Sequence, residues 1–408
     1  MASVVAAGGG LSSGTATAKP SLDSFLTTLN DADRRVFEAY YAAQTFHNAA
    51  RDAYWAKVTA KRKRRRAAIR SGRKVGRAAY VTEFPPAYTG PKVPKRLWKR
   101  WRAYQAKDRT RRKRRTTFPT AADYLALARN VYGFVPERIP EREFKRRYAR
   151  EALALGLTKR QVIRVYALET GGRGTADMVA GVSPITGRGN PISSALGYAQ
   201  LLAANTINVL QKHGNAIEQR LVALRKRSRT QARRDQLTAK LRSLRKMRAV
   251  VRTIPARWSA QRALSRTDRG RGMHALNIDG DIGPWIQVKK LAGVRGYGLR
   301  AGYTSLTSEQ LELMNLAGPG TGIEMMTAIG MKMPTSNFFS RQGYERNSVV
   351  RGRTSAQLIV ALGKRMDRSE RNPGALEFAQ VFDELLRARN ADPPRLLSKP
   401  SRVYFRQD

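Results

Sequence analysis

One glutamate near the middle of the chain combines the features that acid–base chemistry requires. Thr158 is a suitable helix N-cap, and Gly171 and Gly172 form a helix stop, so residues 158–170 are predicted to form a helix that ends just after Glu169. The carboxyl group shares its predicted face with apolar residues at helical spacing, namely Val162, Val165 and Tyr166. Glu169 is therefore expected to point inward at a helix C-terminus.

Both features raise the pKa of the Glu169 carboxyl group. Burial disfavours the anion, and the negative end of the helix dipole disfavours it further. A carboxyl group that is still protonated near neutral pH can act as the general acid in glycoside cleavage. The alternative, on this segment alone, is an ordinary helix-end glutamate that pairs with one of the many arginines.

Two later segments offer groups suited to contact a ligand. Residues 193–202, SSALGYAQLL, resemble a capped helix start at Ser193, in which Gly197 permits close backbone approach and Gln200 offers an amide donor and acceptor. Residues 314–320, MNLAGPG, end an apolar helix in a tight polar turn. Each segment is weakly informative alone, but their order after Glu169 is specific.

Taken in this order, the three segments resemble the motif set of soluble lytic transglycosylases and goose-type lysozymes. That family has a helix ending in Glu-Ser-Gly, then Gly-Leu-Met-Gln, then Tyr-Asn-Ala-Gly-Pro-Gly, and the resemblance covers residues 150–335. It implies a lysozyme-like helical core, peptidoglycan as the substrate and Glu169 as the catalytic acid/base. The substrate-binding residues that it implies are Thr170, Gly197, Tyr198, Gln200, Asn315, Ala317 and Gly318.

The resemblance also implies a reaction that needs one carboxyl group. Glu169 would protonate the glycosidic oxygen between N-acetylmuramic acid and N-acetylglucosamine. A hydroxyl group of the substrate would then close a 1,6-anhydro ring as Glu169 takes its proton back. Asp177, in the Gly- and Pro-rich stretch 175–191, offers an alternative, because it could position a water molecule and give hydrolysis.

The chain departs from the family pattern in two respects. Met314 stands where the family has a tyrosine, so support for the acid must come from elsewhere, with Tyr198 and Tyr303 as candidates. In addition, the stretch 175–191 lengthens the separation between Glu169 and Gln200, and a basic stretch moves the third segment far downstream.

The net charge of +48, from 78 Lys and Arg against 30 Asp and Glu, indicates a polyanionic partner. Such a charge destabilises a compact state by self-repulsion unless anions neutralise it. Peptidoglycan, nucleic acid and anionic cell-wall polymers are the expected partners. The expected polyanion-binding residues are Lys61, Arg62, Lys63, Arg64, Arg65, Arg66, Arg111, Arg112, Lys113, Arg114, Arg115, Arg225, Lys226 and Arg227.

The basic clusters span residues 61–77, 92–115 and 220–252. Trp98, Trp101 and Tyr104 are interleaved with the second cluster, where they could stack on bases or sugars, or could pack against the protein. A second functional hypothesis follows, namely a non-catalytic polyanion-binding structural protein that keeps a degenerate lysozyme-like fold.

The predicted fold class is mainly α, a lysozyme-like helical core with long basic helical extensions and an insertion. The expected organisation is a disordered tail (1–20), a basic helical region with a Pro-rich connector (21–118), the first part of the core domain (119–214), a basic helical insertion (215–265), and the second part with C-terminal helices (266–400).

Several functional classes are disfavoured. The chain has no cysteine, so it forms neither disulfides nor thiolate metal sites, and its three histidines are scattered. Asn277, Asp279 and Asp281 imitate the start of a calcium loop, but Ile282 and Val288 stand where glycine and glutamate are required. No nucleotide-binding motif is present. We therefore expect no metal and no cofactor.

The sequence also leads to expectations about cellular location. Residues 1–20 lack the basic start and apolar stretch of a secretory signal, and no apolar run reaches the roughly 18 residues that a membrane span needs. We expect no membrane span and a protein that is cytoplasmic, carried in a virion or exported by a specialised route. The sequence gives no indication of oligomeric state.

Overall fold

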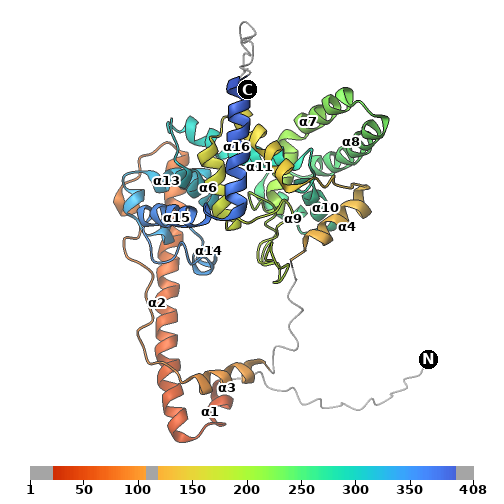
Figure 1. Cartoon of the computed structure of the whole chain (residues 1–408). Coiled ribbons are helices and arrows are strands. Elements are labelled where there is room, and N and C mark those ends of the chain that lie inside the picture. The colour runs from red at the N-terminus through yellow and green to blue at the C-terminus, as the bar shows by residue number, and fades with distance from the viewer. Residues whose placement is uncertain (1–21, 107–117, 392–408) are drawn as a thin grey trace, which may run out of the picture. The chain divides into compact units, whose positions relative to one another are not determined.

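The computed structural model describes residues 22–106 and 118–391, and these are dominated by helices (Figure 1). The prediction of a mainly α fold is confirmed: within the described ranges, β-structure is limited to isolated bridges. The expected disordered tail and the basic run 111–115 lie outside the described residues. The chain divides into two compact units, an N-terminal unit (1–72 with 83–116) and a main unit (73–82 with 117–408).

The N-terminal unit contains α1 (Leu22–Leu26), α2 (Asp31–Arg70) and α3 (Lys95–Ala106). Its core combines the aromatic residues Phe25, Phe37 and Trp101 with Leu26 and Leu97. Trp101 stacks on Tyr104 and Trp98 meets Tyr40, so the aromatic edge of α3 packs against this unit, although Trp98 stays 39% exposed. The proline-rich stretch 84–94 contains no helix, as its prolines predict.

The main unit begins with α4 (Ala121–Tyr132), α5 (Glu141–Ala154) and α6 (Lys159–Thr170). The predicted limits of α6 are confirmed. The Thr158 hydroxyl accepts a hydrogen bond from the Gln161 amide in a capping box, and Gly171 ends the helix in the left-handed conformation at φ 65°.

The predicted helix start at Ser193 is wrong, because the next helix, α7, begins only at Ala203. Gly197 and Gln200 adopt left-handed φ values of 77° and 41°, which a helix cannot contain. The Leu196 and Leu201 backbones pair with each other instead and close a tight turn.

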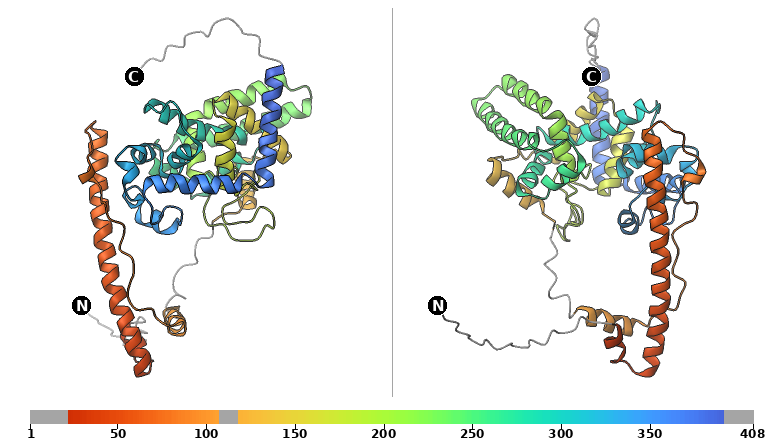
Figure 2. Two further views of the ribbon diagram at one scale, coloured as in Figure 1. Left: turned by 60° about the vertical axis from the view of Figure 1, so that its left-hand side comes forward. Right: turned by 180° about the vertical axis from the view of Figure 1, so that it is seen from behind.

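Helices α7 (Ala203–Arg227) and α8 (Gln231–Arg252) pack against each other as a hairpin (Figures 1 and 2). Their apolar positions face inward at helical spacing and include Ile217, Leu221, Leu237, Leu241, Leu244 and Met247. The intervening Lys and Arg residues remain mostly on the outside, which gives the hairpin a cationic surface. Two short helices, α9 (Trp258–Leu264) and α10 (Asp268–His274), follow.

The second half of the main unit contains α11 (Gly283–Arg300), α12 (Ser308–Ala317), α13 (Pro319–Met326), α14 (Arg341–Arg346), α15 (Ser355–Ser369) and α16 (Pro373–Ala391). Helices α5, α6, α11, α12 and α16 share one apolar core, in which Tyr166, Tyr198 and Phe378 contact one another. The predicted turn after Ala317 is confirmed, with Gly318 at φ 88°. No helix in the described ranges is long and apolar enough to cross a membrane.

Candidate active site

Three helices of the main unit bring four polar side chains together. Glu169 lies near the end of α6, Lys290 lies in α11, and Glu312 and Asn315 lie in α12; we call these four residues the carboxyl quartet. The Asn315 side-chain nitrogen donates to Glu169 Oε1 at 3.2 Å and to Glu312 Oε2 at 3.3 Å. Lys290 Nζ donates to Asn315 Oδ1 at 2.9 Å. Because an ammonium group only donates, Lys290 fixes which end of the Asn315 amide faces the carboxyl groups.

Local helix geometry explains this arrangement. Glu312 and Asn315 are three residues apart in α12 and share a face. The helices that carry the quartet also contribute buried apolar side chains to one core, among them Tyr166, Leu291, Leu311 and Met314. The quartet is therefore a polar group at the edge of an apolar core.

The two carboxyl groups titrate abnormally. Burial raises the pKa of Glu169 to about 7, although a hydrogen bond with Glu312 and the charge of Lys290 act in the opposite direction. Burial, followed by the charge of Glu169, raises the pKa of Glu312 well above its usual value. Burial also lowers the pKa of Lys290. The pair therefore holds a proton near neutral pH, and the proton belongs to both carboxyl groups.

Glu169 and Glu312 differ in the exposure of the whole residue. Glu312 is only 2% exposed, whereas Glu169 and Asn315 keep partial exposure. Ala317 and Gly318, which the resemblance implies as substrate contacts, are also partly exposed and follow Asn315 in the chain. Glu169 is thus the residue of the pair nearer the protein surface, although its carboxyl group is itself buried.

Other residues implied as substrate contacts are engaged within the fold. The Thr170 hydroxyl donates to the Tyr166 carbonyl at 2.7 Å, which is a bond within its own helix. The Gln200 amide nitrogen donates to the carbonyls of Gly197 and Met178 at 2.8 and 3.2 Å. A Cβ atom on Gly197 would meet the Gln287 amide at 2.7 Å, so this glycine permits close packing of side chain on backbone. Within the described structure, neither the Thr170 nor the Gln200 side chain forms a hydrogen bond with the quartet.

The residues considered as support for the acid have other roles. Tyr198 is 1% exposed, and its hydroxyl donates to Glu141 Oε2 at 2.5 Å. Tyr303 packs at the margin of the apolar core. Asn315, which the resemblance implies as a substrate contact, instead donates a hydrogen bond to Glu169.

Asp177 is also held by hydrogen bonds within the fold. Its carboxylate accepts hydrogen bonds from Arg138 at 2.6 Å and from the Thr175 hydroxyl at 2.7 Å. Burial alone would raise the pKa of Asp177, but these two hydrogen bonds hold it below its usual value. An anion held in this way is a poor base for activating water.

The proposed polyanion-binding residues fall into four groups. Lys63, Arg64, Arg66, Lys226 and Arg227 are exposed, and Lys61, Arg62 and Arg225 are partly exposed. Arg65 is only 1% exposed, so it does not belong to the exposed cationic surface of α2. The residues Arg111, Arg112, Lys113, Arg114 and Arg115 lie outside the described ranges.

Sequence reasoning missed Glu312 and Lys290. A signal existed for Glu312, because it precedes Asn315 by one helical turn and lies between the buried residues Leu311 and Leu313. Lys290 gave a weaker signal, as a cation beside the buried Leu291 in a helix with many apolar residues.

Asp279 and Asp281, which resemble the start of a calcium loop, lie in a network of ion pairs with Lys240. Across the described ranges, no group of three or more His, Cys, Asp or Glu residues is arranged to hold a metal ion. Comparison with known proteins gave no match, whether with family models, curated proteins or solved structures.

Proposed function

We propose that this protein cleaves the glycan strands of peptidoglycan, with Glu169 as a single acid/base group. The observation that carries the proposal is a carboxyl group with a pKa of about 7 at a partly exposed helix end, held by Asn315. A group with this pKa is present in both its acid and base forms near neutral pH, as a residue that first donates and then accepts a proton requires.

The proposed reaction uses one proton twice. Protonated Glu169 donates its proton to the glycosidic oxygen, and the bond from that oxygen to the anomeric carbon of N-acetylmuramic acid breaks. The C6 hydroxyl of the same sugar then bonds to the anomeric carbon and gives its proton to the Glu169 carboxylate. The products are a free hydroxyl on the leaving sugar and a 1,6-anhydro end, and Glu169 is regenerated.

The other three members of the quartet act as positioning residues. The Asn315 amide donates to both carboxyl groups and so fixes the direction of the Glu169 side chain. Glu312 is buried, and its hydrogen bond with Glu169 favours the ionised form of Glu169. Lys290 balances the charge that remains when Glu169 is ionised.

The test is to incubate purified sacculi with the wild-type protein, with Glu169→Gln and with Asp235→Asn, and to analyse the soluble products by mass spectrometry. Asp235→Asn makes the same carboxyl-to-amide change at an exposed position of α8. We expect anhydro ends from the wild type and from Asp235→Asn. Loss of a general acid should reduce release by Glu169→Gln about a hundredfold to ten-thousandfold.

The remaining results of this assay are equally informative. Products with reducing ends that depend on Glu169 would assign a hydrolase in place of a lyase. Release that is unchanged in Glu169→Gln, or absent from the wild type, would contradict the proposal.

The second candidate function is polyanion binding without catalysis. The engagement of Gln200 and Thr170 with their own backbone favours it, because these side chains are not presented to a saccharide. The exposed residues Lys63, Arg64 and Arg66 supply a cationic surface. This function predicts that nucleic acid binds wild type and Glu169→Gln equally and that the affinity falls steeply as salt rises.

A further inference from the structure

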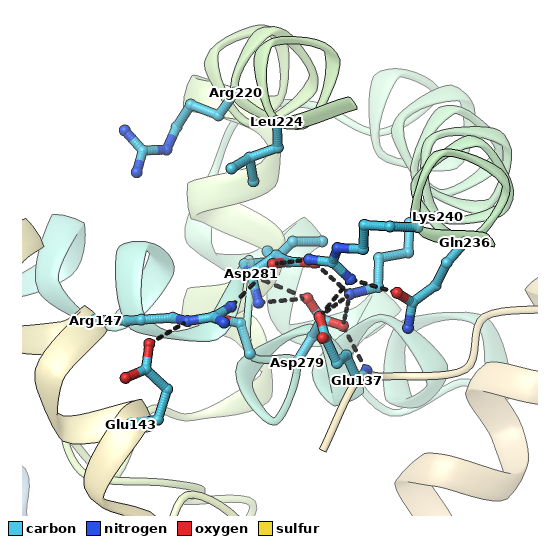
Figure 3. Close-up of polar contacts among 12 residues, drawn as sticks. Glu137, Glu143, Arg147, Arg220, Leu224, Gln236, Lys240, Asp279 and Asp281 are labelled. Atoms are coloured by element: carbon cyan, nitrogen blue, oxygen red, sulfur yellow. Dashed lines mark hydrogen bonds and ion pairs between the residues drawn. The ribbon is translucent and has the colours of Figure 1, made fainter. Parts of the chain in front are cut away.

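A pocket of about 420 Å³ lies on the main unit beside the α7–α8 hairpin, away from the carboxyl quartet (Figure 3). Helix α5 contributes Arg147 and Arg150, α7 contributes Arg220 and Arg227, and α8 contributes Arg233. Figure 3 shows Arg220 and Leu224 above the pocket, with Arg147 and Asp281 below. Its volume falls within the range of about 300–1,000 Å³ that is typical of small-molecule sites.

The lining of the pocket carries an excess of positive charge. Five arginines face three acidic residues, Glu143, Glu151 and Asp281, which leaves a formal charge of +2. Behind this lining, the buried Lys240 pairs with Glu137 and Asp279, and adding these three residues leaves a formal charge of +1. The pocket is therefore suited to an anion.

Carboxylates hold three of the arginines in place. Arg147 binds Glu143 and Asp281, both at 3.0 Å, and Arg233 binds Asp281 at 2.6 Å. Arg220 pairs with Glu151 and lies 5.6 Å from the centre of the Trp285 ring. A guanidinium group has five N–H donors, so each of these arginines keeps donors for a ligand after it has bound its carboxylates. The side chains are thus oriented in advance of binding.

Two further arginines are less constrained. Among the described residues, Arg150 and Arg227 have no ion-pair partner, and both are exposed. They lie near the C-terminal ends of α5 and α7, where each helix dipole contributes about half a negative charge. Two full guanidinium charges exceed that contribution. Arg150 and Arg227 therefore remain available to an incoming anion.

We propose that this pocket binds a phosphate group carried on a small organic unit. The planar donor edges of several arginines match the oxygens of a phosphate, which can accept more than one such pair. One wall of the pocket is apolar and consists of Ala223, Leu224 and Pro284, which suits the organic part of the ligand. The unit is either a free phosphate monoester or one phosphodiester-linked unit of a polymer. This site is independent of Glu169.

The experiment measures binding of three probes to the full chain by isothermal titration calorimetry at moderate salt. Thymidine 5′-monophosphate represents a monoester, thymidylyl-thymidine represents a phosphodiester unit, and thymidine lacks the phosphate. The pocket variant is Arg150→Ala with Arg227→Ala, a pair whose removal breaks no ion pair of the described structure. The control is Arg242→Ala with Lys246→Ala, which removes the same charge from exposed positions of α8 outside the pocket.

At least one of the two phosphate probes should bind more tightly than thymidine. The pocket variant should weaken that binding about tenfold or more, as expected for lost hydrogen bonds between charged groups, and the control should change it less than about twofold. Preference for the monoester would identify a free ligand, and preference for the phosphodiester would identify a polymer.

Two results would overturn the proposal. One is an equal loss of affinity in the pocket variant and the control, since that would reflect the general charge of the protein. The other is binding of a triglutamate peptide that is as tight as that of the phosphate probes and equally sensitive to the pocket variant, because the pocket would then recognise acidic peptides. Thermal unfolding of both double variants establishes that each is folded.

Discussion

The main unit contains two groups of buried acidic residues that behave differently. In the carboxyl quartet, Glu169 and Glu312 share one cation, Lys290, and the pKa of both carboxyl groups is raised. In the second group, Glu137, Asp279 and Asp281 meet three cations, Lys240, Arg147 and Arg233, and we call these six residues the ion-pair network. The number of cations near the carboxyl groups is the main difference.

The two groups show how burial raises the pKa of a carboxyl group and how nearby cations can lower it again. Burial acts to raise the pKa of Glu169, Glu312, Asp279 and Asp281. Lys240, Glu137 and Arg233 nevertheless bring the pKa of Asp281 below its usual value. Asp279 is fully buried, and its pKa remains raised by burial despite Lys240. Asp281 therefore stays ionised near neutral pH, whereas the quartet exchanges a proton there.

The largest expected effect comes from removing the central cation of the network. Lys240→Met removes the ammonium group that pairs with Glu137, Asp279 and Asp281. The free energy of unfolding at neutral pH should fall by about 3–5 kcal/mol. Urea denaturation measures this change, with Lys246→Met, on the exposed side of the same helix, as the control. A loss below about 1 kcal/mol would mean that the network does not stabilise the fold.

A smaller and pH-dependent effect is expected from Lys290→Met in the quartet. At pH 5 the two carboxyl groups are protonated and need no counter-charge, so the cost is about 1 kcal/mol for the lost hydrogen bond to Asn315. At pH 8 an ionised Glu169 lacks its cation, and the loss should approach about 3 kcal/mol. Urea unfolding at both pH values, with Lys364→Met as an exposed control, provides the measurement. Equal losses in the free energy of unfolding at the two pH values would contradict the titration of Glu169 between pH 5 and pH 8.

A third effect concerns the pH dependence of the wild-type protein. The pKa of Glu169 is about 7 in the fold and 4.5 in its ordinary state, so the folded form binds its proton more tightly than the unfolded form. The resulting stability is fully present below pH 4.5 and is lost as pH rises through 7. Its upper limit is about 3.5 kcal/mol, since the difference between 4.5 and 7 counts about 1.4 kcal/mol for each pKa unit. Glu169→Gln should flatten this decline, and Asp235→Asn should leave it intact.

The parts of the fold that could be predicted depend on local signals. The cap at Thr158, the stop at Gly171 and the turn at Gly318 each follow from a few neighbouring residues, and the structure confirms them. The helix start predicted at Ser193 failed because Gly197 and Gln200 adopt left-handed conformations. The close approach of the distant Gln287 side chain to Gly197 accompanies this turn, and no local pattern reveals such a contact.

The candidate site was accessible to sequence reasoning only in part. The position of Glu169 at a helix end followed from spacing, and the resemblance grouped it with Asn315. The contributions of Glu312 and Lys290 depend on how α6, α11 and α12 pack. Hydrophobic periodicity predicts which face of a helix is buried, but it does not predict which polar residues of distant helices meet there. The raised pKa of Glu312 results from its burial between packed helices and from the nearby charge of Glu169.

The central claim is that uncompensated burial makes Glu169 titrate near neutral pH, and carbon NMR tests it most directly. The protein would be labelled at the glutamate side-chain carboxyl carbon, and the Glu169 signal would be assigned by its absence in Glu169→Gln. We predict a titration midpoint of about 7 for Glu169. A midpoint near the ordinary value of 4.5 would contradict the account, since Glu169 would then be an ionised helix-end residue at neutral pH.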